Sequence, residues 1–366
     1  RGHDVTLAEQ SGKLGGLLKF TDYDELKIDL MRLKDYLITQ VDKSGAKVLL
    51  DTTVTPDFIK DGGYDAVILA VGSSPARPPI PGLDTPGVVT SDGLLSDLRP
   101  LDRLAIIGGG VIGVELACVW AAAGARVTIL EAAPRLLPTL ERELGQSLAA
   151  QLRQDGVEVF TGAGVTGVAP GPAVAFTHRG EAYRLEADAV LVATGRRPAT
   201  GGLFAGDLLP ELERGFLRVD GQFRTSIPSL YAIGDAIGGA MLAHKAEAEG
   251  RFVADLLLGR APLRGVAPIP ACVYTSPELA QVGLTADEAR ARGIPCAAGK
   301  CVLSGSAPSD LPLSGRNSAA LCAGADHNKS RCPIYTNHCR RRYGADSEAE
   351  PAESGKYEAG ENKQAA

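Results

Sequence analysis

The residues most able to do chemistry are three glycines that follow a short apolar stretch. Gly108, Gly110 and Gly113 form a G-x-G-x-x-G pattern directly after Leu104–Ile107. Glycines at this spacing let the backbone turn sharply and approach a pyrophosphate, whose charge meets the N-terminal dipole of the following helix. Glu131 lies 18 residues after Gly113, near the roughly 20 residues at which an acid accepts hydrogen bonds from a ribose diol. The pattern therefore predicts a dinucleotide site.

Such a site needs a strand before the glycines, a helix after them and a second strand that ends at the acid. The sequence predicts a buried strand at Leu104–Ile107, a helix over Val111–Ala123 that ends at Gly124, and a strand over Arg126–Leu130. The glycine pattern alone also fits a tight strand-to-helix turn, but here all the required parts agree. The carboxylate of Glu131 repels a 2′-phosphate, which favours NAD over NADP.

The chain repeats itself. Gly2–Glu9 and Gly124–Glu131 share the pattern G-x-x-V-T-x-x-E, and Asp65–Pro75 parallels Asp188–Pro198. A third match lies between these two pairs: Gly45, Val48, Val54 and Thr55 recur at the spacing of Gly156, Val159, Val165 and Thr166. Three matches in the same order indicate two copies of one module.

The first copy is predicted to be incomplete. Glu9 takes the place of Glu131, so the last glycine of its phosphate loop would lie ahead of residue 1. We therefore expect the first strand and phosphate loop of this copy to be missing from the chain. A fragment or a truncated gene explains this better than an unusual fold.

Composition limits the other function classes. The 366 residues carry 38 basic and 44 acidic side chains, a net charge of −6, so general nucleic-acid binding is not expected. No apolar run reaches the roughly 18 residues of a membrane span. The seven cysteines form no dense framework, which is typical of a reducing compartment. We expect a cytoplasmic protein without membrane contact.

Several blocks of the sequence carry a family resemblance. The glycine block resembles the flavoproteins with two dinucleotide-binding domains, as do Ala193–Pro198 and Tyr231–Asp235. Within that group, Met241–Glu247 and Ile269–Glu278 are similar to dihydrolipoamide dehydrogenase. The resemblance is specific over about residues 79–299.

The resemblance implies an α/β fold with two Rossmann-like modules, the NAD module being inserted in the FAD module, followed by a truncated α+β interface domain. The resemblance also implies a homodimer formed through this interface domain, which is truncated here. The implied boundaries are 1–78 and 201–262 for the FAD module, 79–200 for the NAD module, 263–322 for the interface domain and 323–366 for a disordered or aberrant tail.

The resemblance also implies which residues bind cofactors. Glu115 would lie near the meeting point of flavin and nicotinamide, and Asp235 would bind the ribityl-phosphate region of FAD, although a turn or capping role also fits that aspartate. The residues implied for NAD are Gly108, Gly110, Ile112, Gly113, Glu115, Glu131 and Gly195. Those implied for FAD are Glu9, Gly72, Gly234, Asp235, Met241, Leu242, Ala243 and His244.

The chain departs from dihydrolipoamide dehydrogenase near its start. That family carries a redox-active C-x-x-x-x-C pair soon after the first ribose acid, whereas no cysteine precedes Cys118 here. Gln10–Phe20, with its L-G-G motif, resembles instead the flavin region of Old Yellow Enzyme-type ene-reductases and NADH oxidases. The following helix, expected over Asp24–Ser44, fits this second family too.

The chain also departs from the family near its end. Hydrophobic periodicity stops after Cys322, and the family's catalytic His-Glu pair is not found. The one C-x-x-x-x-C pair, Cys296 and Cys301, lies far from any flavin motif and is expected to be structural. Zinc is not expected at the end of the chain, because the following residues lack the required spacing: His327, Cys332, His338 and Cys339.

We therefore expect an FAD-dependent oxidoreductase that transfers hydride between NAD(H) and flavin, with a small-molecule electron acceptor or a lipoyl-bearing protein as partner. The missing disulfide and His-Glu pair argue against turnover of dihydrolipoamide. Two alternatives stay open. One is an electron-relay module of an ene-reductase or NADH oxidase, and the other is an inactive fragment that folds around residues 100–200 and binds NAD.

Overall fold

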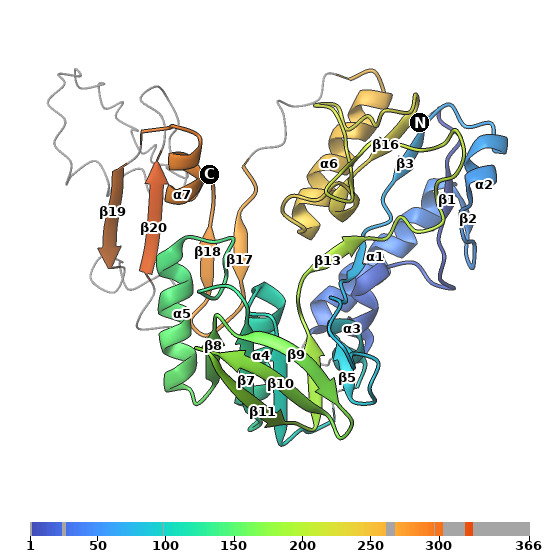
Figure 1. Ribbon diagram of the computed structural model, residues 1–366. Helices are drawn as coiled ribbons and strands as arrows, with labels where there is room; N and C mark the ends of the chain where they lie inside the picture. The colour runs from blue at the N-terminus through green and yellow to red at the C-terminus, as the bar shows by residue number, and fades with distance from the viewer. Residues whose placement is uncertain are drawn as a thin grey trace, which may run out of the picture.

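The computed structural model describes residues 2–23, 27–97, 99–260, 268–295, 297–302 and 319–324. Its largest sheet has five parallel strands in the order β5-β12-β6-β7-β8 (Figure 1). The strands are Val88–Thr90, Ala189–Val192, Arg103–Ile107, Arg126–Glu131 and Glu158–Thr161, in that order.

Two layers cover this sheet, so its strands are buried on both faces. On one face, Leu104 and Ile106 of β6 pack with side chains of α3, α4 and α5, which span Ser91–Ser96, Val111–Ala122 and Arg142–Gln154. On the other face, Ala105 and Ile107 pack with the antiparallel sheet β9-β10-β11, whose strands are Gly164–Ala169, Ala173–His178 and Glu181–Glu186. Burial on both faces explains why β6 is a continuous apolar run.

The strand, helix and strand predicted around the glycine pattern are confirmed. Helix α4 ends one residue before the predicted end, with Ala123 at its C-cap and Gly124 in the left-handed conformation at φ 96°. Strand β7 extends one residue further than predicted and includes Glu131.

The other half of the molecule is built from smaller sheets. Strands β1 (Thr6–Ala8) and β2 (Lys47–Leu49) pair in parallel, and so do β3 (Val67–Leu69) and β16 (Leu230–Ala232). The remaining elements of this half are η1 (Gly16–Tyr23), α1 (Ile28–Ser44), α2 (Pro56–Asp61), β14 (Leu212–Glu213), β15 (Phe216–Leu217), η3 (Gly234–Ile237) and α6 (Ala243–Leu257). The expected helix over residues 24–44 begins at Ile28, and residues 24–26 lie outside the described part.

The internal repeat is present in the strand register. Leu7 of β1 is opposite Val48 of β2, and Ile129 of β7 is opposite Val159 of β8. Val48 and Val159 are equivalent in the repeat, and Leu7 and Ile129 hold the same position before Glu9 and Glu131. The two copies therefore pair these strands in the same register.

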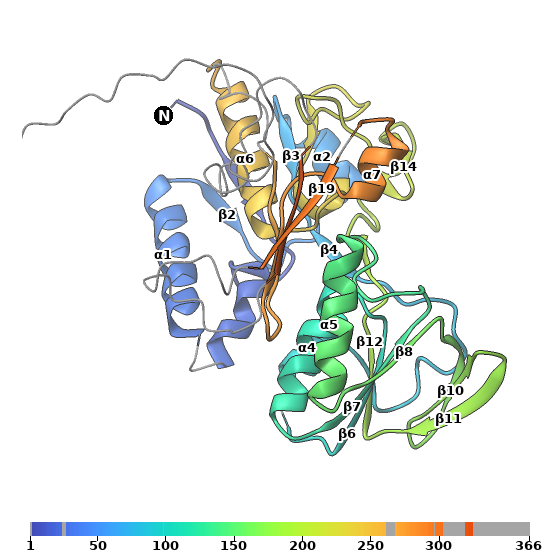
Figure 2. The same ribbon diagram turned by 90° about the vertical axis from the view of Figure 1, so that its left-hand side faces the viewer.

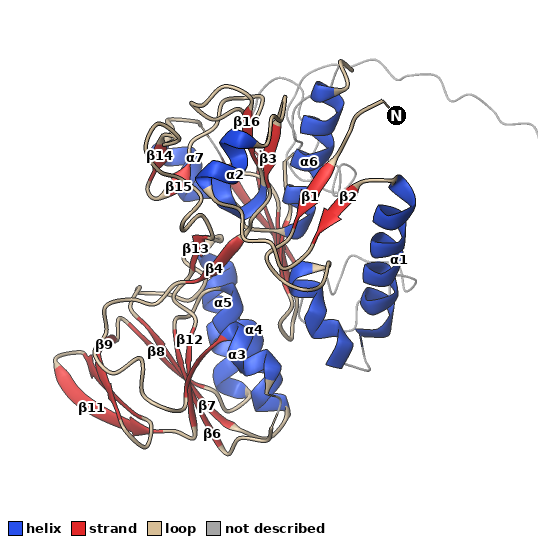
Figure 3. Ribbon diagram, turned by 90° about the vertical axis from the view of Figure 1, so that its right-hand side faces the viewer, coloured by secondary structure: helices blue, strands red, loops and turns tan. Residues whose placement is uncertain are grey.

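A short antiparallel pair joins the two halves (Figure 3). Strand β4 (Ser73–Pro75) leads into the five-stranded module, and β13 (Arg196–Pro198) leads out of it. Each follows a glycine in the left-handed region, Gly72 at φ 68° and Gly195 at φ 115°. The two connections between the modules thus lie side by side.

A C-terminal hairpin packs against the five-stranded module. The hairpin of β17 (Ala271–Val273) and β18 (Leu279–Gln281) contributes Val273 and Leu279 to the same core cluster as α4 and α5. Beyond it lie α7 (Ala286–Ala291), β19 (Ala297–Val302) and β20 (Ala319–Gly324).

The predicted α/β fold, with two Rossmann-like modules and a third, smaller domain, is confirmed. Strand β20 extends two residues into the segment predicted to be disordered or aberrant, and the rest of that segment lies outside the described residues. None of the described helices is long and apolar enough to cross a bilayer.

The turn between β6 and α4 leaves little room for side chains. A Cβ atom on Gly113 would lie 2.0 Å from the carbonyl oxygen of Gly108, and one on Gly108 would lie 2.4 Å from that of Ala193. A Cβ atom on Gly110 would meet no atom within 4 Å. Helix α4 can therefore approach β6 this closely only with glycine at position 113, whereas position 110 faces open space.

We expect Gly113→Ala to lower the free energy of unfolding of this module by about 1–3 kcal/mol, because backbone must move to accept the methyl group. Gly110→Ala should lower it by less, about 0.5 kcal/mol, because it adds no clash and only replaces glycine by the poorer N-cap residue alanine. Trp120, the single tryptophan, is 5% exposed in α4, so its fluorescence reports unfolding of this module. Equal stability of the two variants would contradict the close approach.

Candidate functional site

The residues predicted to bind a dinucleotide meet at one edge of the five-stranded sheet. The glycine turn follows the carboxyl end of β6, Glu131 ends β7, and Gly195 follows β12. Strand β6 is hydrogen-bonded between β7 and β12, and all three strands are parallel. Their carboxyl ends therefore bring these three groups together.

The start of α4 is suited to an anion. Gly110 is the N-cap residue and supplies no side-chain hydrogen bond to the first turn. The first N–H groups of a helix have no partner within the helix, and they carry the positive end of its dipole. Because the space beside Gly110 is open, a phosphate group can approach these N–H groups closely.

Glu131 is held in place by backbone donors. Its side chain accepts hydrogen bonds from the N–H of Gly109 at 2.5 Å and from that of Ala133 at 2.6 Å, and the residue is 9% exposed. In the first copy, Glu9 accepts one from the N–H of Ser11 at 2.7 Å. Both acids thus bind the N–H two residues ahead, which orients each carboxylate at the end of its strand.

Glu115 and Ile112 lie on α4. The Glu115 Oε1 atom accepts a hydrogen bond from the backbone N–H of Tyr274 at 2.8 Å, which connects the helix to the C-terminal hairpin. Burial raises the pKa of the Glu115 carboxyl, and the Tyr274 N–H only partly offsets this effect. Ile112 is half-buried against the core. Burial likewise raises the pKa of the Cys118 thiol, which disfavours the reactive thiolate.

Asp235 lies in a polar network that joins the two modules. Its Oδ2 atom accepts a hydrogen bond from the Ser73 hydroxyl at 2.6 Å and lies 3.9 Å from Arg196 Nε. The Arg196 guanidinium also donates to the Ser73 hydroxyl at 2.6 Å and to its carbonyl at 2.7 Å. Sequence reasoning missed Ser73 and Arg196, although both directly follow the paired glycines of the repeat, Gly72 and Gly195.

A buried ion pair supports the turn that contains Asp235. Glu249 is 3% exposed, accepts the N–H of Gly234 at 2.7 Å and pairs with Lys245 at 2.8 Å. Lys245 also donates to the Gly234 carbonyl at 3.2 Å. Sequence reasoning missed this pair, and its only signal is the helical i, i+4 spacing of a lysine and a glutamate.

The start of α6 holds the other residues predicted to lie beside a flavin. Met241 and Leu242 are half-buried, and Ala243 and His244 are exposed. Leu242 is the N-cap residue and makes no capping hydrogen bond. The ring Nε2 atom of His244 lies 2.8 Å from the Pro270 carbonyl, so this ring is held against the chain leading to the hairpin.

The structure brings the predicted FAD residues together only in part. Gly72 and Gly234 follow the paired strands β3 and β16, and Asp235 is next to Gly234. Glu9 follows β1, which is paired with β2 and with no other strand among the described residues. Glu9 therefore follows a different strand pair from the one that precedes Gly72 and Gly234.

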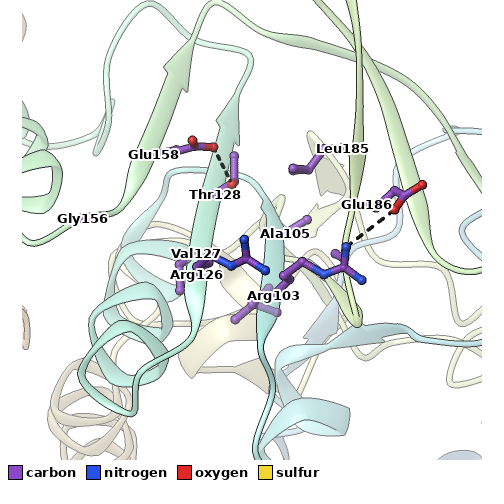
Figure 4. Close-up of a pocket in the computed structure, with 11 residues that line it drawn as sticks. Arg103, Ala105, Arg126, Val127, Thr128, Gly156, Glu158, Leu185 and Glu186 are labelled. Atoms are coloured by element: carbon purple, nitrogen blue, oxygen red, sulfur yellow. Dashed lines mark hydrogen bonds and ion pairs between the residues drawn. The ribbon is translucent and has the colours of Figure 1, made fainter.

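A cavity of about 270 Å³ lies at the amino ends of β6 and β7, opposite the glycine turn. Figure 4 shows the residues that line it. Arg103 and Arg126 line it at the amino ends of these strands. Arg103 is paired with Asp188 at 3.0 Å and with Glu186 at 3.6 Å. This cavity is distinct from the glycine turn.

The described part of the chain contains no group of three or more potential metal ligands. Cys118 and Cys272 are free. Cys296 lies outside the described residues, so the expectation for the Cys296–Cys301 pair is not tested. The same holds for the residues weighed as zinc ligands: His327, Cys332, His338 and Cys339.

Known proteins are similar to this chain in sequence and in fold. A dihydrolipoyl dehydrogenase of Trypanosoma brucei brucei is 38% identical over 265 residues, which are 68% of this chain and 55% of that protein. The chain thus spans about half the length of this relative.

Two solved structures are also similar. The Cu(II) complex of the HOCl-induced flavoprotein disulfide reductase RclA from Escherichia coli has a TM-score of 0.73 and 26% identity, and the match covers 89% of this chain and 82% of that one. A 2-naphthoyl-CoA reductase in complex with 2-naphthoyl-CoA has a TM-score of 0.52 and 27% identity, with 69% of this chain and 36% of that chain covered.

Two family descriptions match the chain. Residues 269–312 match the Pyridine nucleotide-disulphide oxidoreductase dimerisation domain, which agrees with the predicted interface domain. Residues 6–250, more than half of the chain, match Pyridine nucleotide-disulphide oxidoreductase itself. The chain therefore belongs to the pyridine nucleotide-disulphide oxidoreductase family.

Proposed function

We propose that this chain binds NAD(H) at the glycine turn and FAD beside Asp235, and that it serves transfer of hydride between the two. The family as a whole uses FAD and NAD(P). The observation that carries the proposal is the position of Glu131 beside the turn, where its carboxylate accepts the Gly109 N–H while the space beside Gly110 stays open.

The residues present fit a dinucleotide. Gly108 makes the tight turn, Gly110 leaves space for a pyrophosphate, and Gly113 allows the helix to approach, which are the three roles that the motif requires. Glu131 would accept hydrogen bonds from the adenosine ribose and disfavour a 2′-phosphate, so NAD is proposed over NADP. Gly195, Ile112 and Glu115 would complete this site.

The residues present also fit part of an FAD site. Asp235 would bind the ribityl-phosphate region, and the hydrogen bonds from Ser73 and the nearby Arg196 would keep its carboxylate oriented. Lys245 and Glu249 would position the Gly234 turn. Glu9 and Gly72, and the α6 start at Met241, Leu242, Ala243 and His244, would contribute the remaining contacts.

When bound, the two cofactors supply the redox chemistry, in which hydride passes between nicotinamide and flavin. The chain itself binds them and orients them. We further propose domain boundaries at residues 78, 200, 262 and 322, homodimerisation through the interface domain, and a cytoplasmic location.

The proposed acceptor is a small molecule rather than dihydrolipoamide. No cysteine precedes Cys118, so the segment after Glu9 cannot supply a redox disulfide. A second candidate is an electron relay to another flavin or acceptor, as in ene-reductases and NADH oxidases. It is favoured by the L-G-G segment at residues 14–16 and by the likeness to the 2-naphthoyl-CoA reductase.

The first test is the visible absorption spectrum of the purified chain before and after addition of NADH. We expect a flavin band that bleaches with NADH, because both cofactors would then be bound and in contact. Asp235→Asn should reduce the flavin content, whereas Asn at the exposed Asp220 should not. A colourless protein that still binds NADH would favour the inactive NAD-binding fragment.

The second test concerns the nucleotide. We expect NADH to bind at least about tenfold more tightly than NADPH, because Glu131 repels a 2′-phosphate. Glu131→Gln should reduce this preference, and Gly110→Ala should weaken binding of both nucleotides while leaving the fold intact. Titrations followed by NADH fluorescence measure these affinities. Equal affinity of the unaltered chain for NADH and NADPH would contradict the assignment of Glu131.

The third test uses the raised pKa of Glu115. The ordinary pKa of a glutamate is about 4.3, and the pKa of Glu115 in the folded protein is higher. Between these two pKa values the folded state binds more protons than the unfolded state, so stability falls as the pH rises through this window. Glu115→Gln keeps an acceptor for the Tyr274 N–H but carries no charge. The variant should therefore gain stability relative to the unaltered chain as the pH rises through this window.

Thermal unfolding at several pH values measures this gain. Gln at the exposed Glu213 serves as the matched control and should follow the unaltered chain at every pH. Parallel curves for Glu115→Gln and the unaltered chain would contradict the burial of this carboxyl in the folded protein.

A further inference from the structure

The cavity at the amino ends of β6 and β7 lies between the two sheets of the module. Leu104 and Val127, which follow its two arginines, belong to the cluster on the helical face. Since successive side chains of a strand point to opposite faces, Arg103 and Arg126 point toward the antiparallel sheet. Figure 2 shows β10 and β11 on one side of β6 and β7, and α4 and α5 on the other. Strands β11 and β8 complete the lining with Leu185, Glu186 and Glu158.

Two arginines are neighbours on the wall of this cavity. Arg103 of β6 is opposite Arg126 of β7 in the strand register, and neighbouring strands lie only about 4.8 Å apart. Like charges at opposed positions destabilise a sheet. Arg103 is neutralised by Glu186 at 3.6 Å and by Asp188 at 3.0 Å. Arg126 is exposed, and its guanidinium forms no ion pair or hydrogen bond with a described residue. One positive charge on the wall is therefore left for an anion.

One carboxylate of the lining is likewise without a cation. Glu158 of β8 is opposite Thr128 of β7, and its Oε2 atom accepts a hydrogen bond from the Thr128 hydroxyl at 3.1 Å. Thr128 is 6% exposed, so a fixed group orients this carboxylate. Glu158 forms no ion pair with any residue that the structure describes. Figure 4 shows the bond from Thr128 to Glu158 and the pair of Arg103 with Glu186, with no such line from Arg126.

The two unpaired charges lie within reach of one small molecule. Arg126 is two residues before Thr128 on the same face, which puts its Cα atom roughly 8 Å from that of Glu158. The cavity of about 270 Å³ is smaller than the roughly 300–1,000 Å³ of sites for drug-sized ligands. Ala105 and Leu185 make part of its lining apolar. A matching ligand thus carries one carboxylate, one ammonium and a small apolar group.

We propose that this cavity binds a small zwitterion with an apolar side chain, of the class of the aliphatic α-amino acids. The guanidinium of Arg126 would bind the carboxylate, because its planar fork matches the two oxygens. Glu158 would accept hydrogen bonds from the ammonium, and the apolar group would lie against Leu185. The cavity is at the other end of β6 and β7 from the glycine turn, so the inference does not rest on the proposed function.

The test is a titration of the full chain with L-leucine, followed by saturation-transfer NMR, in which we expect saturable binding. L-Leucinamide lacks the carboxylate and N-acetyl-L-leucine lacks the ammonium, so each should bind at least about tenfold more weakly. Inorganic phosphate at the same concentration should not displace L-leucine, because Glu158 repels a multiply charged anion. No saturable binding of L-leucine, or equal binding of the three compounds, would overturn the proposal. So would displacement by phosphate, because a site for simple anions would then explain the binding.

Variants locate the binding in this cavity. Arg126→Gln and Glu158→Gln should each weaken binding of L-leucine by at least about tenfold, and Glu158→Gln should also reduce the preference for L-leucine over N-acetyl-L-leucine. Both residues are exposed, so the variants should keep the unfolding temperature of the unaltered chain. Arg142→Gln is the matched control, because Arg142 is also exposed but lies on α5, across the sheet. It should change binding by less than about twofold. Equal weakening by Arg142→Gln and Arg126→Gln would place the ligand elsewhere and overturn the proposal.

Discussion

The close approach of α4 to the turn after β6 is the constraint on which the nucleotide module depends. A methyl group at Gly113 would lie 2.0 Å from the Gly108 carbonyl oxygen. The first turn of the helix and the turn after β6 are therefore in direct backbone contact, with no room for a side chain between them. This contact directs the start of α4 toward the carboxyl edge of the sheet. It also brings the Gly109 N–H within 2.5 Å of Glu131. One packing contact therefore sets both the direction of the helix dipole and the position of the acid beside it.

The two copies of the repeat share local structure but differ in how deeply equivalent leucines are buried. The strand register is the same in both copies, and in both the acid accepts a hydrogen bond from the N–H two residues ahead. The leucines of α1 and α5 nevertheless differ greatly in exposure. Leu144 and Leu148 of α5 are buried in the cluster that contains side chains of β6 and α4, whereas Leu33 and Leu37 of α1 are exposed among the described residues.

Patterns close together in the sequence were predictable. The strand, turn and helix around Gly108 form as expected, because glycine spacing and apolar runs act over a few residues. The contacts of Asp235 with Ser73, and of Glu115 with Tyr274, could not be predicted in this way. Each joins residues more than 150 positions apart, and periodicity within one element does not specify which side chains meet across elements. The strand over Ala319–Gly324 likewise extends beyond the point where apolar periodicity stops, because its pairing with β19 comes from another segment.

The β4–β13 pair has a consequence for how such a protein can evolve. The chain enters the inserted five-stranded module after Pro75 and leaves it at Arg196. These two residues are opposite each other in the β4–β13 pair. Because the two ends of the inserted module are adjacent, the module takes the place of a short surface loop between β3 and β16. Its insertion therefore does not require these two strands to move apart. The module between these strands is therefore portable: it can be exchanged for another with adjacent ends while β3 and β16 stay paired.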